Sequence, residues 1–304
     1  MTITATGLVK SYGRKPVLRG VDLDVAEGTV FALLGPNGAG KTTTVQILST
    51  LIAADAGEAR VAGHDVRRDG DAVRAAIGVT GQFSALDNLL TANENLMLMA
   101  DLHHLDRPVG RRRTAGLLER FELTEARDQP VVTFSGGMRR KLDLAMTLVG
   151  SPRVIFLDEP TAGLDPRSRR TMWDIIQSLV ADDRVTVFLT TQYLEEADRL
   201  ASRVAVLDGG RVVAEGTPQE LKRRMPGGHI RMRFAGVPDL DAAAGRFAAG
   251  TADREALTLR IPGDGRPATL RSVLAVLDGV PVEELTVHTP DLDDVFLSLT
   301  GGTR

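Results

Sequence analysis

Residues 35–42 read Gly35-Pro36-Asn37-Gly38-Ala39-Gly40-Lys41-Thr42, a glycine-rich loop that ends in a lysine and a threonine. Glycines at this spacing let backbone N–H groups surround phosphate oxygens without clashes from Cβ atoms. The lysine of such a loop reaches the β- and γ-phosphates of a nucleotide, and the hydroxyl after it binds Mg²⁺. The loop therefore predicts a nucleoside triphosphate site, with Lys41 on the phosphates and Thr42 on the metal.

The segments on either side of this loop fit a strand and a helix. Residues 30–34 form a short apolar run, which is typical of a strand buried on both faces of a parallel sheet. Residues 42–51 have spacing compatible with a helix, whose positive dipole end faces the same phosphates. Strand, phosphate loop and helix in this order predict an α/β fold of the P-loop NTPase class.

A second apolar run, residues 154–157, is followed directly by Asp158 and Glu159. If this run is a strand of the same sheet, Asp158 lies at the edge where the loop and its metal lie, and we assign it to Mg²⁺. Glu159 is placed to orient or deprotonate an attacking water.

A third motif, Phe134-Ser135-Gly136-Gly137, precedes a stretch with helical spacing at residues 141–149. A serine hydroxyl and unobstructed glycine N–H groups at the start of a helix favour an anion. An ordinary helix N-cap is the alternative interpretation of this motif taken alone.

Changes in pattern along the chain predict its organisation. Residues from about 86 to 149 are rich in leucine and methionine at helical spacing, which predicts a helical insertion. Strand patterns return at 185–189 and in a hairpin at 204–213, and Pro226-Gly227-Gly228 is the best linker candidate. We expect a nucleotide-binding domain over 1–225, with a helical subdomain at about 83–150, and a small α/β domain of unknown role over 226–304.

Composition excludes several classes of function. The chain has no cysteine, which excludes disulfides, thiolate catalysis and cysteine-based metal sites. Its net charge of −3 gives no support for nucleic-acid binding, and we expect none. No apolar run approaches the roughly 18–20 residues of a membrane span, and the amino terminus has no signal-peptide pattern. Action at a membrane would therefore need another chain.

In their order and spacing the motifs resemble the ATPase subunits of ATP-binding cassette (ABC) transporters, over residues 1 to about 225. Ala162-Gly163-Leu164-Asp165 completes the set. The resemblance implies an ABC-type nucleotide-binding domain, with a mixed sheet core and a helical subdomain, that hydrolyses ATP with Mg²⁺. The nucleotide contacts that it implies are Tyr12, Gly35, Pro36, Asn37, Gly38, Ala39, Gly40, Lys41, Thr42, Thr43, Gln82, Ser135, Gly136 and Gly137.

The resemblance also implies roles for individual residues. Tyr12 would stack on adenine, for which a solvent-exposed turn residue is the alternative, Gln82 would link Mg²⁺ and water to the helical subdomain, and Asp165 would bridge a dimer. The implied catalytic residues are Lys41, Glu159 and Gln192. The implied Mg²⁺ ligands are Thr42, Gln82 and Asp158.

Three departures separate the chain from the usual pattern of this family. Phe134 and Met138 stand where leucine and glutamine are usual, Gly81 stands where proline is common, and Gln192 replaces a histidine that contacts the γ-phosphate. Glutamine can donate a hydrogen bond to a phosphate oxygen, but it cannot become cationic as histidine can. We therefore predict slow hydrolysis that depends on Glu159, with Gln192 as a sensor of the γ-phosphate.

The same variants, including Gly81-Gln82-Phe83 and Thr191-Gln192-Tyr193, resemble the daunorubicin-resistance type of drug-exporter ATPase. Leu292-Asp293-Asp294-Val295-Phe296-Leu297 resembles the end of ATPases that pair with ABC-2-type permeases. The resemblance implies a peripheral subunit on the cytoplasmic face of the membrane. Its partners would be a permease on a separate chain and a second copy of itself, with ATP between the copies.

The helical insertion would pass movement to the permease. Phe83, Leu86 and Leu89 are its candidate contacts, and core packing is the alternative for each. Three other functions stay open: export of a lipid or polysaccharide, a soluble ABC ATPase without a membrane partner, and a non-catalytic scaffold gated by nucleotide. Ribosomal types usually carry two cassettes and repair types carry long insertions, whereas one phosphate loop and no such insertion are visible here.

Overall fold

The computed structural model describes residues 1–81, 85–223, 228–263, 266–288 and 291–300. These residues belong to two compact units, Met1–Pro218 and Gln219–Arg304. The candidate site residues lie in the first unit, except Gln82, which falls outside the described residues together with Phe83.

The first unit contains a six-stranded sheet in the order β10-β9-β3-β8-β7-β6. Its strands are β3 (Val30–Leu34), β6 (Ile77–Thr80), β7 (Val154–Asp158), β8 (Thr186–Thr191), β9 (Arg203–Asp208) and β10 (Arg211–Gly216). All run parallel except β10, which pairs antiparallel with β9. Every residue of β3, β7 and β8 is buried, as a sheet covered on both faces requires. The predicted strands and the hairpin are confirmed.

A four-stranded antiparallel sheet, in the order β2-β1-β4-β5, forms a second layer. Its strands are β1 (Ile3–Tyr12), β2 (Lys15–Val25), β4 (Ala56–Val61) and β5 (His64–Asp65). The β1–β2 hairpin was not predicted from the sequence. The pairing of β1 shifts register between Ala5 and Leu8, where Gly7 has a φ of +62°. Such a bulge interrupts the alternation of buried and exposed residues that would reveal a strand.

Helix α1 (Lys41–Leu48) belongs to the core between these two sheets. Its buried side chains share one hydrophobic cluster with residues of both sheets. Across the parallel sheet, Phe31, Phe188 and Phe156 lie in register, with ring centroids 5.4 and 5.6 Å apart. The helix ends at Leu48 rather than at the predicted residue 51, because Thr50 adopts a left-handed φ of +66°.

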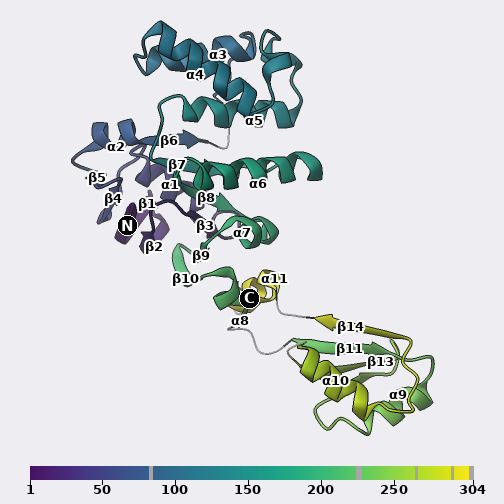
Figure 1. Cartoon of the computed structure of the whole chain (residues 1–304). Helices are drawn as coiled ribbons and strands as arrows, with labels where there is room; N and C mark the ends of the chain where they lie inside the picture. The colour runs from purple at the N-terminus through teal and green to yellow at the C-terminus, as the bar shows by residue number, and fades with distance from the viewer. Residues whose placement is uncertain (82–84, 224–227, 264–265, 289–290, 301–304) are drawn as a thin grey trace. The chain divides into compact units, whose positions relative to one another are not determined.

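The stretch between β6 and β7 is helical, as predicted, and contains α3 (Ala92–Leu102), α4 (Arg107–Arg120) and α5 (Gly136–Leu148). Figure 1 shows these three helices grouped together beside the sheet layers. Thr91 and Glu94 form a reciprocal capping box at the start of α3. The unit also contains α2 (Gly70–Ala76), α6 (Pro166–Ala181) and α7 (Leu194–Leu200), each of which contacts the parallel sheet.

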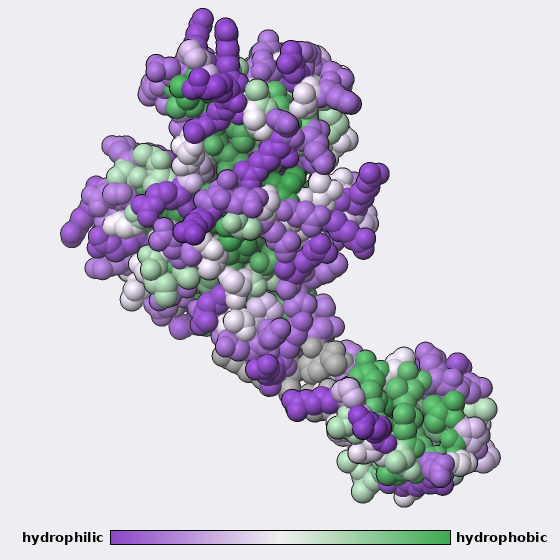
Figure 2. All heavy atoms as spheres, in the orientation of Figure 1, coloured by the Kyte–Doolittle hydropathy of each residue, from purple (hydrophilic) through white to green (hydrophobic). Residues whose placement is uncertain are grey.

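The second unit has a four-stranded antiparallel sheet in the order β12-β13-β11-β14. Its strands are β11 (His229–Arg233), β12 (Thr251–Asp253), β13 (Thr258–Pro262) and β14 (Glu284–His288), and its helices beyond α8 (Pro218–Arg223) are α9 (Val237–Ala244), α10 (Pro267–Val276) and α11 (Leu292–Thr300). A small core around Ile230, Met232 and Leu259 holds it together. Figure 2 shows hydrophobic residues gathered on its visible face.

Within the described ranges, none of the helices has the length and apolar character needed to cross a bilayer.

Candidate functional site

A cavity of about 390 Å³ lies where the glycine-rich loop meets the carboxyl end of β7. The loop follows β3 and Glu159 follows β7, and both strands run in the same direction with β8 between them. The lining residues are Lys15, Val17, Asn37, Gly38, Gly40, Lys41, Thr42, Thr43 and Glu159. The structure thus brings together the loop and the glutamate that two separate motifs predicted.

The loop has the backbone geometry of an anion cradle. Gly38 and Gly40 have φ values of +81° and +111°, which residues with a side chain rarely adopt. A Cβ on Gly40 would also lie 2.5 Å from Leu18 Cδ2. Gly40 is the N-cap of α1, and the first N–H groups of a helix have no acceptor within it. These features fit the phosphate chain of a nucleotide.

Lys41 and Glu159 face each other inside this cavity. The Lys41 ammonium is buried and donates hydrogen bonds to the carbonyl oxygens of Gly35 at 2.8 Å and Pro36 at 3.2 Å. Its Nζ atom lies 3.4 Å from Glu159 Oε1. A cation that binds phosphate and a carboxylate that could accept a proton therefore lie within one small space.

Oxygen ligands suited to Mg²⁺ lie at the same edge of the sheet. Asp158 is buried and accepts a hydrogen bond of 2.5 Å from Thr190 Oγ1. Thr42 is exposed and lines the cavity. A hydroxyl and a carboxylate are hard donors of the kind that Mg²⁺ takes alongside substrate phosphates, so the donor set fits the metal. The assignment to Mg²⁺ stays a prediction for Thr42, Asp158 and Gln82.

The backbone at Glu159 is strained. Its φ of +51° lies in the left-handed region, which costs a residue with a side chain about 1–2 kcal/mol. Its N–H donates to the carbonyl oxygen and to Oγ1 of Thr190, at 3.1 and 3.2 Å. On the other side of the turn, Arg140 of α5 donates to the Glu159 carbonyl oxygen at 3.2 Å. Arg140 was not among the residues predicted for the site.

A buried carboxyl group joins the turn after β7 to helix α7. Glu196 accepts hydrogen bonds from Thr161 Oγ1 at 2.7 Å and from Trp173 Nε1 at 3.0 Å. Burial raises the pKa of Glu196. Sequence reasoning missed this residue, although it stands beside Ala197, on the buried side of a short helix, where a glutamate is unusual.

Gln192 follows the last residue of β8, next to the loop. The Gly35 N–H donates to the Thr191 carbonyl oxygen at 3.2 Å, and the Tyr193 N–H donates to Thr191 Oγ1 at 2.9 Å. These bonds fix the backbone on both sides of Gln192, which is half-buried. Its contact with a phosphate stays a prediction.

Tyr12 lies at the end of β1, in the hairpin that also carries Lys15. Half of its surface is exposed, and the Lys10 ammonium lies 5.9 Å from its ring centroid. Tyr12 does not line the cavity, but Lys15 does. Adenine stacking on Tyr12 therefore stays a prediction, for which the exposed ring leaves room.

The Ser135-Gly136-Gly137 motif does not line the cavity of the loop in the described part of the chain. Ser135 caps α5, since its Oγ accepts a hydrogen bond from the Met138 N–H at 3.2 Å. A Cβ on Gly137 would lie 2.7 Å from Ser168 Oγ, so glycine permits close packing against α6. Within one chain, Ser135 therefore acts as an ordinary helix N-cap, which was the alternative interpretation of this motif.

Asp165 has a local structural role as the N-cap of α6. Its Oδ1 accepts hydrogen bonds from the N–H groups of Arg167 and Ser168, at 2.9 and 3.0 Å. The hydrogen bond from the Ser168 hydroxyl is the main cause that lowers the pKa of Asp165, and the Ser168 N–H adds to it. Its predicted contact across a dimer is a separate role that stays a prediction.

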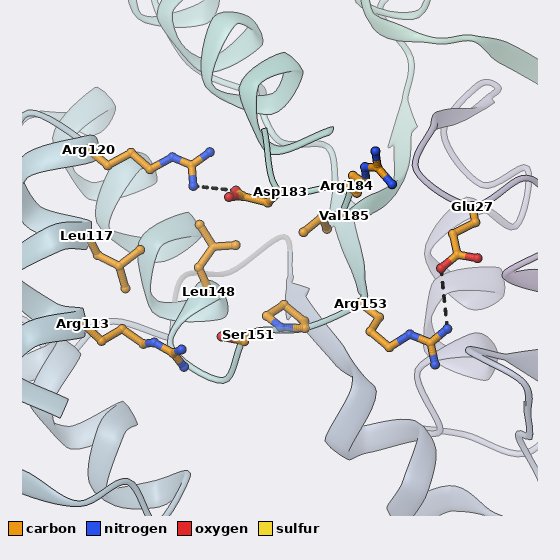
Figure 3. Close-up of a pocket in the computed structure, with 11 residues that line it drawn as sticks. Glu27, Arg113, Leu117, Arg120, Leu148, Ser151, Arg153, Asp183, Arg184 and Val185 are labelled. Carbon is orange, nitrogen blue, oxygen red and sulfur yellow. Dashed lines mark hydrogen bonds and ion pairs between the residues drawn. The ribbon is translucent and has the colours of Figure 1, made fainter. Parts of the chain in front are cut away.

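A second cavity of about 440 Å³ lies at the opposite edge of the parallel sheet, where β7 and β8 begin (Figure 3). Two ion pairs line it. Arg120 of α4 contacts Asp183 at 2.5 Å, and Arg153 contacts Glu27 at 3.6 Å. These pairs link the helical stretch and neighbouring loops to the sheet. Among the described residues that line this cavity there is no predicted site residue.

Comparisons with known proteins agree with the geometry of the first cavity. A family model described as ABC transporter matches residues 18–162. The chain is 49% identical over 306 residues to a daunorubicin resistance ATP-binding protein of Streptomyces coeruleorubidus, which covers 98% of this chain and 95% of that protein. It is 37% identical over 302 residues to a Nod factor export ATP-binding protein of Ralstonia nicotianae. This match covers 98% of this chain and 94% of that protein.

Among solved structures, a dimeric ATP-binding cassette in a post-hydrolysis state, bound to ADP and Pi, matches with a TM-score of 0.64 at 26% identity. The match covers 71% of this chain and 98% of that chain. The nucleotide cradle, the sheet topology and the extent of these similarities all indicate the same family. The chain therefore belongs to the ABC transporter ATP-binding proteins, and it is an ABC ATPase that couples ATP hydrolysis to transport.

Proposed function

We propose that this chain energises the export of a drug-like, amphipathic molecule through an ABC-2-type permease formed by a separate chain. The placement of Lys41 and Glu159 in one cavity, 3.4 Å apart, carries the catalytic part of the proposal. The daunorubicin resistance relative, at 49% identity over nearly the whole chain, supports a drug as cargo. The relative named for Nod factor export supports a different cargo, such as a lipid or polysaccharide, as the second candidate.

The proposed roles in hydrolysis follow from the cavity. Lys41 and the loop N–H groups bind the phosphates, and Glu159 accepts a proton from the attacking water. Gln192 donates a hydrogen bond to the γ-phosphate. Thr42, Asp158 and Gln82 would hold Mg²⁺, which neutralises phosphate charge when it is bound. Most of the catalysis is positioning and charge stabilisation.

Transport tests the cargo and the location together. The chain would be expressed with a candidate ABC-2-type permease, and inverted membrane vesicles would be supplied with Mg-ATP and daunorubicin. We expect ATP-dependent uptake of the drug, and recovery of the chain with membranes only when the permease is present. Leu89, whose exposed fraction is 85%, is a candidate permease contact. Uptake of a lipid or saccharide without uptake of the drug would favour the second candidate.

We further propose that two copies of the chain enclose ATP. In one copy the Ser135 motif lies away from the loop cavity, whereas its capped helix start is suited to an anion. The loop of one copy and the Ser135 motif of the other would then share a nucleotide. The solved cassette that is dimeric and bound to ADP and Pi supports a dimer.

Sedimentation should detect this dimer. With saturating Mg-ATP we expect a shift from monomer to dimer, strongest in a Glu159→Gln variant, because the intact γ-phosphate is the link between the copies. A Gly137→Ala variant should dimerise less, since the added Cβ would press on Ser168. A chain that stays monomeric in saturating Mg-ATP, in both the wild type and Glu159→Gln, would contradict the proposal.

Gln192 should affect rate and pH dependence differently. A Gln192→Ala variant loses one donor to the γ-phosphate, so we expect a fall in kcat of roughly 10-fold. A Gln192→His variant introduces a group that titrates, so its rate profile should gain an inflection near pH 6.5. The measurement is kcat between pH 5.5 and 8.5. Profiles of wild type and Gln192→His that coincide would place residue 192 away from the phosphate.

A further inference from the structure

Arg140 of α5 is bonded to the turn that carries Glu159. Its Nε donates to the Pro160 carbonyl oxygen at 2.8 Å, and its Nη2 donates to the carbonyl oxygens of Asp158 and Glu159, each at 3.2 Å. One guanidinium therefore contacts three consecutive carbonyl oxygens at the end of β7. A planar group with several fixed donors is suited to such a set of acceptors, and an ammonium is not.

The same side chain also reaches the segment that precedes Gln82. Arg140 Nη1 donates to the Gly81 carbonyl oxygen at 3.2 Å and to Asp143 Oδ2 at 3.2 Å. Asp143 Oδ1 in turn accepts the Ala85 N–H at 3.3 Å. Burial lowers the pKa of Arg140, and the carboxylates of Asp143 and Asp158 oppose this shift. The Arg140–Asp143 pair thus holds residues on both sides of Gln82.

We propose that Arg140 is a positioning residue of the ATPase, which holds Glu159 in its left-handed conformation. The strained turn is fixed on its N–H side by Thr190 and on its carbonyl side by Arg140. Arg140 also joins this turn to α5, the helix that begins after Ser135. The proposal rests on the proposed function, because it needs Glu159 to act in hydrolysis.

Arg120 provides a matched control within the same unit. Like Arg140, it reaches from the helical stretch to the rest of the unit, where it contacts Asp183 at 2.5 Å (Figure 3). It also donates to Ser178 Oγ at 3.3 Å. These contacts lie at the opposite edge of the sheet from Glu159. A general weakening of the link to the helices would slow hydrolysis in both Arg120→Ala and Arg140→Ala. Loss of positioning at Glu159 would slow it only in Arg140→Ala.

The experiment measures ATP affinity, thermal stability and the single-turnover rate of hydrolysis. Arg140→Ala should lower the rate by about 10- to 100-fold and change ATP affinity by less than about threefold. Arg140→Lys should recover part of the rate, because an ammonium reaches fewer of the carbonyl oxygens. Arg120→Ala should keep the rate within about twofold. Equal losses in Arg120→Ala and Arg140→Ala would overturn the proposal.

A double-mutant cycle separates positioning from general damage. If Arg140 acts through Glu159, Arg140→Ala should slow a Glu159→Gln enzyme by less than about threefold. Losses that multiply would overturn the proposal, and so would a wild-type rate in Arg140→Ala. If Arg140→Ala does not fold, Arg140→Lys is the test of the proposal. A wild-type rate of hydrolysis in Arg140→Lys would then overturn the proposal. A wild-type chain without any hydrolysis, or a Glu159→Gln variant at full rate, would instead refute the proposed function itself.

Discussion

Replacing Glu159 with glutamine should slow ATP hydrolysis by about 10²- to 10³-fold while ATP affinity stays nearly unchanged. Glutamine has the size of glutamate, and the backbone bonds to Thr190 and Arg140 do not depend on the side chain. It cannot accept a proton from water, and it removes the negative charge 3.4 Å from Lys41 Nζ. Single-turnover assays with the enzyme in excess measure the rate, and titration with a fluorescent ATP analogue measures the affinity.

Glu195→Gln is the matched control for this variant. Glu195 is an exposed carboxylate in the first turn of α7 and does not line the cavity. We expect it to change the rate by less than about twofold, as for most exposed charges. If Glu159→Gln hydrolyses ATP as fast as the wild type, Glu159 is not the base and the catalytic assignment is wrong.

Replacing Lys41 with alanine should weaken ATP binding by about 100-fold or more and abolish measurable hydrolysis. The ammonium is buried at the bottom of the cradle, where each charge-assisted hydrogen bond to a phosphate contributes about 1.5–3 kcal/mol. Alanine supplies neither the charge nor the donors. Titration calorimetry with ATP in the presence of Mg²⁺ measures the affinity, and phosphate release measures the hydrolysis.

Lys15→Ala provides a control with the same change of charge. Lys15 lines the same cavity but is exposed, so solvent screens its charge and we expect a loss of affinity below about threefold. Circular dichroism should report a folded protein for both variants. If Lys41→Ala binds ATP as tightly as the wild type, the loop is not the phosphate site.

The parallel core was predictable because its signals are local. Residues 30–34 and 154–157 are continuous apolar runs, and each ends at a motif whose spacing is fixed by phosphate chemistry. Since parallel strands end at one edge of a sheet, the meeting of Lys41 and Glu159 followed from these patterns. The β1–β2 hairpin gave a weaker signal, because the bulge at Gly7 breaks its alternation.

The contacts that hold Glu159 in place were not predictable from one sequence. Arg140 stands among charged residues at the start of α5, where an arginine is most often solvated. Only the folded chain reveals that its guanidinium reaches the carbonyl oxygens of Asp158, Glu159 and Pro160. Such contacts join segments far apart in sequence and use backbone acceptors, which leave no residue pattern. The strained φ of Glu159 is likewise a property of the three-dimensional turn.

The most direct test of the central claim is a calorimetric titration of the wild-type chain with ATP in the presence of Mg²⁺. The cradle at the start of α1 predicts saturable binding of about one nucleotide per chain, which Lys41→Ala should abolish at the same concentrations. A folded wild-type chain that shows no saturable binding of ATP would contradict the account.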